Sequence, residues 1–458
     1  MTDAPARGWR KLLLRLFELF RRLVDVREGE MPALLIAWAY FYCLLTINYI
    51  LRPMREQLGL AGGEIGLAIN FLGTLGGMLV ANPLYAWIVT RWPRQKFLPF
   101  VYRFFAANLV AFYLLFRFSP EPWQPAISFA FFVWVSVINL FAVAVFWSLL
   151  ADLFSFEQGK RLFGFISVGG SLGAITGSTF VSQAAKSVEP GILMLVAVAL
   201  FEVAVQAMRA LVRKRGLRPE TPVEARGAGS VRPEDEETGG ILNGMSLVFR
   251  SSYLSWICLY MLLGSIAGTI LYFLQADIVS AAASDKGAQT AIFAKIDLGV
   301  NVLTLLVQLF LTGRMVKRLG LGVTLCLQCA AFGIALVFLG LEPTLFVLAC
   351  AMVLFRTGHY ATSRPAREVL FTVVGREAKY KSKSFIDTFV YRGGDAIGAW
   401  LKVGLGSIGG LGLQGIALAS LPIAAAWAAV AIVLGRNQQR FVHGREGDEP
   451  LPRARAVR

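Results

Sequence analysis

Long apolar segments separated by short polar ones run along the whole chain. Each is about 20 residues or longer, the length that an α-helix needs to cross the hydrocarbon core of a bilayer. Because that core holds no water, a spanning segment must satisfy its own backbone hydrogen bonds, and a helix does so. The pattern predicts twelve transmembrane helices, at residues 31–51, 66–90, 97–116, 124–151, 163–185, 189–213, 252–278, 289–312, 321–341, 343–373, 384–409 and 411–435.

A polar segment divides these predicted helices into two sets of six. It contains Arg232-Pro-Glu-Asp-Glu-Glu-Thr-Gly-Gly240, which is too charged to be buried. Near the start of the chain, residues 8–27 have the basic amphipathic pattern of a helix that lies on a membrane surface. We therefore expect a surface segment at 1–30, a first bundle at 31–213, a linker at 214–251, a second bundle at 252–435 and a basic tail at 436–458.

An internal repeat relates the two sets. Thr46-Ile-Asn-Tyr-Ile-Leu51 matches Thr269-Ile-Leu-Tyr-Phe-Leu274, which lies 223 positions later. The same offset takes Arg91 to Arg314, each in the loop after the second helix of its set. Two parallel repeats of six helices are the arrangement of major facilitators, whose substrate site lies between the halves near the bilayer midplane. The predicted fold class is therefore an all-α membrane protein of this arrangement.

Glycines recur at intervals of four on three predicted helices. They are Gly73 and Gly77, then Gly169, Gly173 and Gly177, then Gly394 and Gly398. Small residues at this spacing let helix backbones approach closely. The pattern fits static packing, and it also fits a smooth surface along which the two halves rock.

Composition agrees with a membrane protein. Of the 458 residues 56% are hydrophobic and 16% charged, and the mean hydropathy is +0.61. The net charge of +16 comes mainly from loops on one side, which is typical of cytoplasmic loops that face anionic lipid rather than of nucleic-acid binding. We expect a multi-pass inner-membrane protein, monomeric, with both termini in the cytoplasm. The Cys326/Cys329 pair falls in an apolar run and is interpreted as packing rather than metal binding.

Ionisable residues at membrane depth are costly, and four groups of them stand out. The first follows the first predicted helix, where Arg52 and Arg55 flank Pro53. The helix either continues past the proline, which puts both arginines on one side, or breaks into two segments there. The second half has Gln275 and Ile278 at the equivalent positions, so the cationic pair belongs to one half only. The pair either binds a ligand or anchors the helix at the interface.

The second group lies on the tenth predicted helix. It comprises Arg356, His359, Arg364, Arg367 and Glu368. Guanidinium groups bind phosphate and carboxylate in a bidentate fork, which points to an anionic cargo. The alternative is that the membrane ends near Arg364, where Pro365 should kink the helix, so that the later arginines are solvated.

The third group lies on the eleventh predicted helix. Asp387, Tyr391 and Asp395 are four residues apart and are expected on one face, and Arg392 can pair with Asp395. These residues either take part in transport or form a structural ion pair that holds the two halves together.

The fourth group is Lys295 and Asp297 on the eighth predicted helix. Being two residues apart, they point to different faces, and each is expected to pair with a neighbouring helix. Asp297 is also a candidate to carry a coupling proton.

Four motifs resemble one known family. They are Tyr49-Ile-Leu-Arg-Pro-Met-Arg-Glu56, Phe146-Trp-Ser-Leu-Leu-Ala-Asp152, Glu157-Gln-Gly-Lys-Arg-Leu-Phe-Gly164 and Lys381-Ser-Lys-Ser-Phe-Ile-Asp-Thr-Phe-Val-Tyr-Arg-Gly-Gly-Asp395. Together they look like the bacterial branch of the nucleotide transporter family, the ATP:ADP antiporters and NTP/NDP exchangers. The resemblance implies exchange of nucleotides that carry several phosphates.

The same resemblance assigns individual positions. Those that match the family's functional residues are Arg55, Glu56, Arg367, Glu368, Lys383 and Asp387. The chain departs from the family pattern at Val135, where a glutamate is usual, and at Gly394, where a lysine is usual.

These features together predict a secondary active transporter that exchanges nucleotides or other phosphorylated anionic metabolites by alternating access. The expected substrate-binding residues are Tyr49, Arg52, Arg55, Glu56, Arg356, His359, Arg364, Arg367, Lys383, Asp387, Arg392 and Asp395. Lys295, Asp297 and Glu368 are expected in ion coupling or in pairs between the bundles. No P-loop or metal-ligand motif occurs, so we expect neither an enzyme nor a cofactor. The alternatives are an exporter of another organic solute and a non-transporting sensor or assembly protein.

Overall fold

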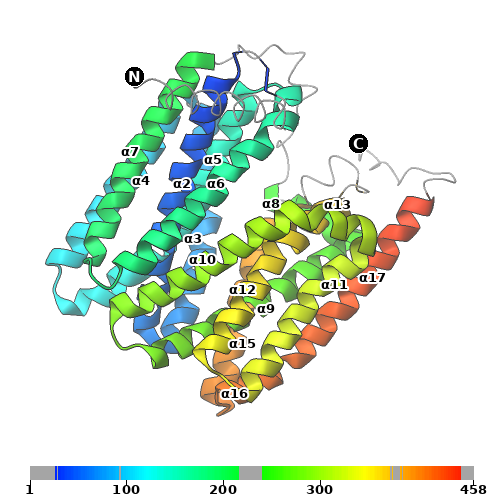
Figure 1. The fold of residues 1–458 in the computed structure, drawn as a ribbon. Helices are drawn as coiled ribbons and strands as arrows, with labels where there is room; N and C mark the ends of the chain where they lie inside the picture. Colours follow the sequence, from blue (N-terminus) through cyan, green and yellow to red (C-terminus); the bar gives the residue numbers. More distant parts are fainter. Residues whose placement is uncertain are drawn as a thin grey trace, which may run out of the picture.

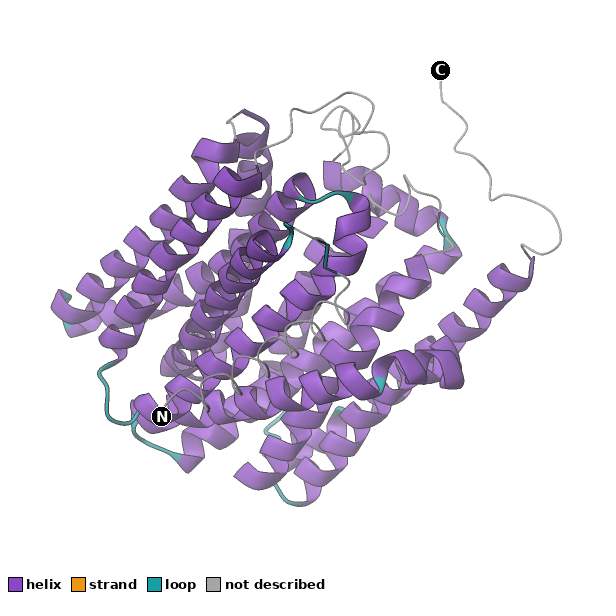
Figure 2. Ribbon diagram, turned by 45° about the horizontal axis from the view of Figure 1, so that its top comes forward, coloured by secondary structure: helices purple, strands orange, loops and turns teal. Residues whose placement is uncertain are grey.

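The computed structural model describes residues 26–27, 29–91, 94–215, 240–371, 374, 382–383 and 385–444. The described residues form helices joined by short turns, and they contain no strand (Figure 2). The surface helix expected at 8–27 lies almost wholly outside them.

The first half of the chain forms one bundle of long helices (Figure 1). Its helices are α2 (Met31–Gly59), α3 (Gly63–Arg91), α4 (Arg94–Phe118), α5 (Gln124–Leu153), α6 (Phe156–Ala184) and α7 (Pro190–Arg215), with short 3-10 turns η1 (Leu60–Gly62) and η2 (Glu121–Trp123). The helix α2 runs eight residues past the predicted end at 51 and contains Pro53, so the chain does not break there.

The second half forms the other bundle (Figure 1). Its helices are α8 (Gly240–Arg250), α9 (Ser252–Ala282), α10 (Lys286–Phe310), α11 (Thr312–Leu341), α12 (Leu345–Gly358), α13 (Arg364–Leu370), α15 (Tyr391–Val403), α16 (Leu413–Ala419) and α17 (Leu421–Gly444), with π-helical turns η5 (His359–Ser363), η7 (Ile386–Val390) and η8 (Gly404–Ile408). The helix α8 lies inside the stretch predicted as linker, and α17 extends into the predicted tail.

Ten helical stretches of the described chain are long and apolar enough to cross a membrane. The first, Met31–Leu84, contains both α2 and most of α3. The stretch around α15 is not among the ten, and it carries Asp387, Arg392, Asp395 and Lys402. The all-helical membrane fold is confirmed, and the count of twelve stays a prediction that this arrangement fits.

Polar residues at the helix starts explain several boundaries. Ser155 and Gln158 form a reciprocal capping box at the start of α6. The side chains of Ser251, Asp285 and Thr344 accept backbone N–H groups at the starts of α9, α10 and α12. Each cap lies in a short connection between two apolar runs, so the loops supply the groups that the exposed N–H donors need.

Each bundle has its own apolar core, and a smaller apolar cluster joins the two. The joining cluster contains Leu67, Ala68 and Phe132 from the first half and Phe273, Ala276, Ala399 and Val403 from the second. It lies toward the end of the molecule that carries the α2–α3 connection, where α3 packs on α15 and α10 on α6. The halves are therefore sealed together at this end.

The regularly spaced glycines pack within each half rather than between the halves. A Cβ at Gly169 or Gly177 would come within 2.7 Å of a backbone oxygen of Trp38 or Thr46 on α2. Gly394 and Gly398 likewise face α9 of their own bundle. These contacts favour the packing interpretation over a sliding surface between the halves.

Candidate functional site

Three of the predicted site residues on α2 form a compact charged group. Glu56 Oε1 lies 2.7 Å from Arg55 Nη2 and 3.3 Å from Arg52 Nε, so one carboxylate oxygen serves both arginines. Arg55 also donates to Ser136 Oγ at 3.0 Å, and its guanidinium stands 4.7 Å from the centre of the Phe132 ring on α5. The uninterrupted helix through Pro53 places both arginines beside Glu56.

The second half contributes an acid and an arginine that are paired with each other. Asp297 on α10 lies 2.6 Å from Arg356 Nη1 on α12, and its second oxygen lies 3.8 Å from Arg52 Nε. Arg356, Asp297 and Glu56 are each less than one-tenth exposed. We call Arg52, Arg55, Glu56, Asp297 and Arg356 the central charge cluster. It joins both halves and contains three cations and two anions, so one positive charge is in excess.

Two tyrosines at equivalent positions of the internal repeat border the central charge cluster. Tyr49 lies under the Arg52 guanidinium, 6.0 Å from ring centre to Cζ. Tyr272, 223 positions later, lies beside Glu56. Tyr360 in turn η5 lies beside Arg52. The cluster therefore has aromatic hydroxyl groups on both sides of the boundary between the halves.

The tenth predicted helix is interrupted at its arginines. The α-helix α12 ends at Gly358, the π-helical turn η5 follows, and α13 begins at Arg364. Pro365 has no N–H, and its ring would clash with the carbonyl four residues earlier in an α-helix, which a π turn relieves. Arg356 thus faces the central charge cluster, whereas Arg364 is exposed and His359 is half-buried.

A second ionic group gathers the residues that the family resemblance singles out. Arg367 Nη1 lies 3.4 Å from Asp387 Oδ1, and Lys383 Nζ lies 2.6 Å from Glu368 Oε2. Arg367 also lies 4.0 Å from Glu368. They belong to two segments, 367–368 and 383–387, that come together where α13 meets turn η7. Glu368, Lys383 and Asp387 are more exposed than the central charge cluster.

Arg392 and Asp395 form the predicted pair, at 3.1 Å. Asp395 also accepts hydrogen bonds from Ser265 (2.5 Å) and Thr269 (3.2 Å) of α9. All four residues belong to the second half, so this pair ties α15 to α9 and does not hold the two halves together. Arg392 remains more than one-quarter exposed.

The π-helical turn η7 changes the expected face of the eleventh helix. It contains Asp387 and leads directly into α15, and a π turn contains more residues than an α turn. Asp387 is therefore rotated out of line with Tyr391 and Asp395, and it pairs with α13 instead. On α10, Asp297 has the expected neighbours, whereas Lys295 is exposed and has no ion-pair partner among the described residues.

Lys402 is an important residue that the sequence analysis missed. Its side chain is fully buried, and its Nζ contacts Glu64 of α3 and, at 2.8 Å, Asp277 of α9. Ser407 Oγ donates to the other oxygen of Glu64 at 3.4 Å. This group ties the halves together beside the joining apolar cluster. The signal was present, because Lys402 is a charged residue inside the predicted span 384–409 that none of the four groups included.

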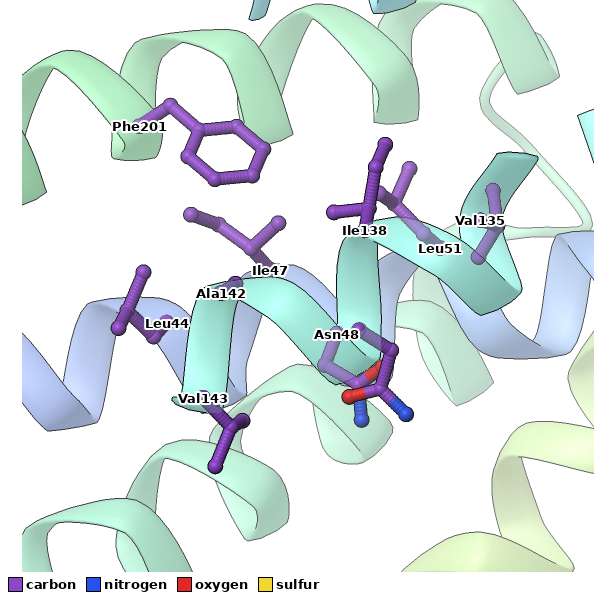
Figure 3. Close-up of a pocket in the computed structure, with 10 residues that line it drawn as sticks. Leu44, Ile47, Asn48, Leu51, Val135, Ile138, Ala142, Val143 and Phe201 are labelled. Atoms are coloured by element: carbon purple, nitrogen blue, oxygen red, sulfur yellow. The ribbon is translucent and has the colours of Figure 1, made fainter. Parts of the chain in front are cut away.

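A pocket in the first half is apolar rather than charged. It lies between α2, α5 and α7 and is lined mainly by aliphatic side chains and Phe201, with Asn48 turned away from the Phe201 ring (Figure 3). Such a lining does not suit an anion. Among the described residues, no three His, Cys, Asp or Glu side chains lie close enough to hold a metal ion. Cys326 and Cys329 donate to backbone oxygens of Ala428 and Leu325, consistent with packing.

Comparison with known proteins agrees with this architecture. The profile of the Major Facilitator Superfamily matches residues 33–399. An auto-inhibited POT family peptide transporter superposes with a TM-score of 0.62 at 14% identity, over 93% of this chain and 99% of that chain. A mutant of the nucleoside transporter NupG gives a TM-score of 0.58 at 14% identity, over 89% of this chain and 98% of that chain. Identities this low show the fold alone.

No curated protein sequence matches the chain. The family profile covers most of the chain, including α2 and its arginines as well as most of α15. The protein belongs to the Major Facilitator Superfamily and is a multi-pass membrane transporter rather than an enzyme.

Proposed function

We propose that this transporter exchanges nucleotides or other phosphorylated anionic metabolites across the inner membrane by alternating access. The observation that carries the proposal is the central charge cluster, in which arginines from both halves meet around two buried acids. An anion held by arginines of both halves would link them, which is what a carrier needs in order to couple cargo binding to their rearrangement.

The chemistry of these arginines suits phosphate groups. The planar guanidinium group binds phosphate oxygens in pairs and is more weakly hydrated than an ammonium group. The excess positive charge of the cluster favours an anion over a neutral or cationic solute. The second ionic group, around Arg367 and Lys383, is more exposed and provides further cationic contacts for an extended, multiply charged cargo.

Nucleotides are the first candidates because of the motif residues. Arg55 belongs to the central charge cluster, and Arg367, Glu368, Lys383 and Asp387 lie together in the second ionic group. We place both termini in the cytoplasm, because the basic loops favour that side. The end sealed by Lys402 then faces outward.

A transport screen tests the proposal. Proteoliposomes containing the full-length protein are preloaded with unlabelled nucleotide, and uptake of radiolabelled ADP, ATP, a sugar phosphate and the neutral nucleoside adenosine is measured. We expect uptake of at least one phosphorylated compound that depends on the internal load, and none of adenosine. Uptake of adenosine alone would instead support the exporter of another organic solute.

A further inference from the structure

Asp297 does not use its full hydrogen-bonding capacity with Arg52 and Arg356. Its contact with Arg356 uses one oxygen and one nitrogen, at 2.6 Å. The other oxygen, Oδ2, and the other terminal nitrogen of Arg356, Nη2, are buried and make no hydrogen bond with any described residue. A bidentate pair would use both sides of the guanidinium fork. The Nη2 side of the Arg356 guanidinium is therefore available to bind an oxygen atom of another anion.

The surroundings of Asp297 are cationic or neutral, with one further acid. The titratable and charged groups that face it are Arg52, Glu56 and Tyr49 from α2, Arg356 from α12 and Tyr360 from turn η5. The helix α6, which packs along α10, contributes the neutral hydroxyl of Ser178 as a hydrogen-bond partner of Asn301. Arg52 and Arg356 are therefore what neutralises the Asp297 carboxylate.

We propose that Asp297 is the internal counter-ion that the cargo replaces, and that it takes up one proton from water each time it is replaced. This inference rests on the proposed function, because it presumes that an anion binds to Arg52 and Arg356. It adds a coupling to the transport cycle: each cargo anion is transported together with one proton.

The loss of its arginine partners explains why Asp297 would take up a proton. When a phosphate group engages Arg356 and Arg52, an ionised Asp297, only 2% exposed, would be left as a buried carboxylate without a cation. Leaving one member of a buried pair unpaired is strongly unfavourable, and a buried group relieves this by becoming neutral. The proton adds to the carboxylate and is released when the cargo leaves and Arg356 returns to it.

Glu56 does not share this role, because it keeps an arginine outside the pair that holds Asp297. Its Oε1 contacts both Arg52 and Arg55, whereas its Oε2, like Asp297 Oδ2, is buried without a hydrogen-bond partner among the described residues. Loss of Arg52 to the cargo still leaves Glu56 with Arg55. With Asp297 protonated, three arginines face one carboxylate, so two positive charges are free, which matches a doubly charged phosphate group.

Calorimetry on the purified full-length protein tests the inference. Binding of ADP and of inorganic pyrophosphate is titrated at one pH in two buffers of different ionisation enthalpy, which gives the protons taken up on binding. We expect about one proton per anion, and an affinity that falls about tenfold per pH unit toward alkaline pH. Anion binding without proton uptake would overturn the inference and leave the proposed function intact. If neither anion binds, both fail.

A substitution identifies the residue that carries the proton. Asp297→Asn should still bind the anion, as tightly as the wild type or more tightly, with no proton uptake and a flat pH profile. Asp285→Asn, at the exposed start of the same helix, is the matched control, because asparagine caps a helix as well as aspartate does. Proton uptake that persists in Asp297→Asn would show that another group takes the proton. The two-buffer measurement on the wild type decides the inference even if this variant does not fold.

Discussion

Arg52 and Asp297 approach to 3.8 Å across the boundary between the two halves of the protein. Arg52 lies on the first transmembrane helix of the first half, and Asp297 lies on the second of the other half. Because Asp297 also holds Arg356, one buried acid connects cations of both bundles. The halves therefore meet in a charged contact at membrane depth as well as in an apolar one.

The pairing of Arg356 with Asp297 makes a prediction about stability. Arg356→Ala should lower the free energy of unfolding by about 3–5 kcal/mol, because it leaves Asp297 buried with only the more distant Arg52. The double variant Arg356→Ala/Asp297→Ala should recover part of that loss. Thermal unfolding of the detergent-purified protein measures both. With Asp297→Ala measured as well, a loss in the double variant equal to the sum of the two single losses would show that the pair is not coupled.

Lys402 should hold the two halves together at the end that carries the α2–α3 connection. Ile65 and Ile408 are exposed and follow Glu64 and Ser407, which are in contact. In a background without the five native cysteines, Ile65→Cys and Ile408→Cys should therefore cross-link readily. Adding Lys402→Gln should reduce the cross-linking yield, because it removes the cation that Glu64 contacts.

The matched control is Lys286→Gln, an exposed lysine at the start of α10. It should leave the cross-linking yield unchanged. An unchanged yield in Lys402→Gln as well would mean that the apolar cluster alone keeps this end closed.

Glu30, which lies just before the first span, should make stability depend on pH. Burial by itself raises the pKa of the Glu30 carboxyl, but hydrogen bonds from Arg161, the Arg27 backbone and Gln158 outweigh it and lower the pKa below the usual 4.5. A lowered pKa means that these contacts stabilise the protein fully above 4.5, and that the contribution is lost as the pH falls through the lowered value.

Glu30→Gln measures this contribution. The variant should be less stable than the wild type at neutral pH, by about 1–3 kcal/mol for hydrogen bonds to a charged group. The gap should narrow as the solution becomes acidic. Unfolding temperatures of both proteins across this range provide the measurement, and a gap that is constant with pH would contradict the assignment.

Close packing of α6 on α2 should be sensitive to a single methyl group. A Cβ at Gly173 would overlap the backbone oxygen of Tyr42, so Gly173→Ala should destabilise the protein by about 1–3 kcal/mol. Gly164→Ala, on the same helix with no atom within 4 Å of the added Cβ, should be neutral or stabilising. Thermal unfolding compares the two, and equal effects would refute the packing interpretation.

Much of the fold could be predicted because apolar length alone sets where a helix can cross a bilayer. The pairing of Arg392 with Asp395 could also be predicted, since it depends only on helical spacing. The position of Asp387 could not, because the π turn at Ile386–Val390 changes the phase of the helix and leaves no periodic signal in the sequence. The contact of Asp297 with Arg356 required the three-dimensional arrangement of two helices.

Exchange of radiolabelled ADP by proteoliposomes containing wild type, Arg55→Ala or Arg117→Ala tests most directly whether the central charge cluster binds the cargo. Arg117 forms an exposed ion pair with Glu189 and does not belong to the cluster, so its variant controls for loss of one positive charge. With equal amounts of inserted protein, we predict that Arg55→Ala lowers exchange by about tenfold or more, as expected for a lost charge-assisted hydrogen bond, while Arg117→Ala matches the wild type. Undiminished exchange in Arg55→Ala would contradict anion binding at the cluster.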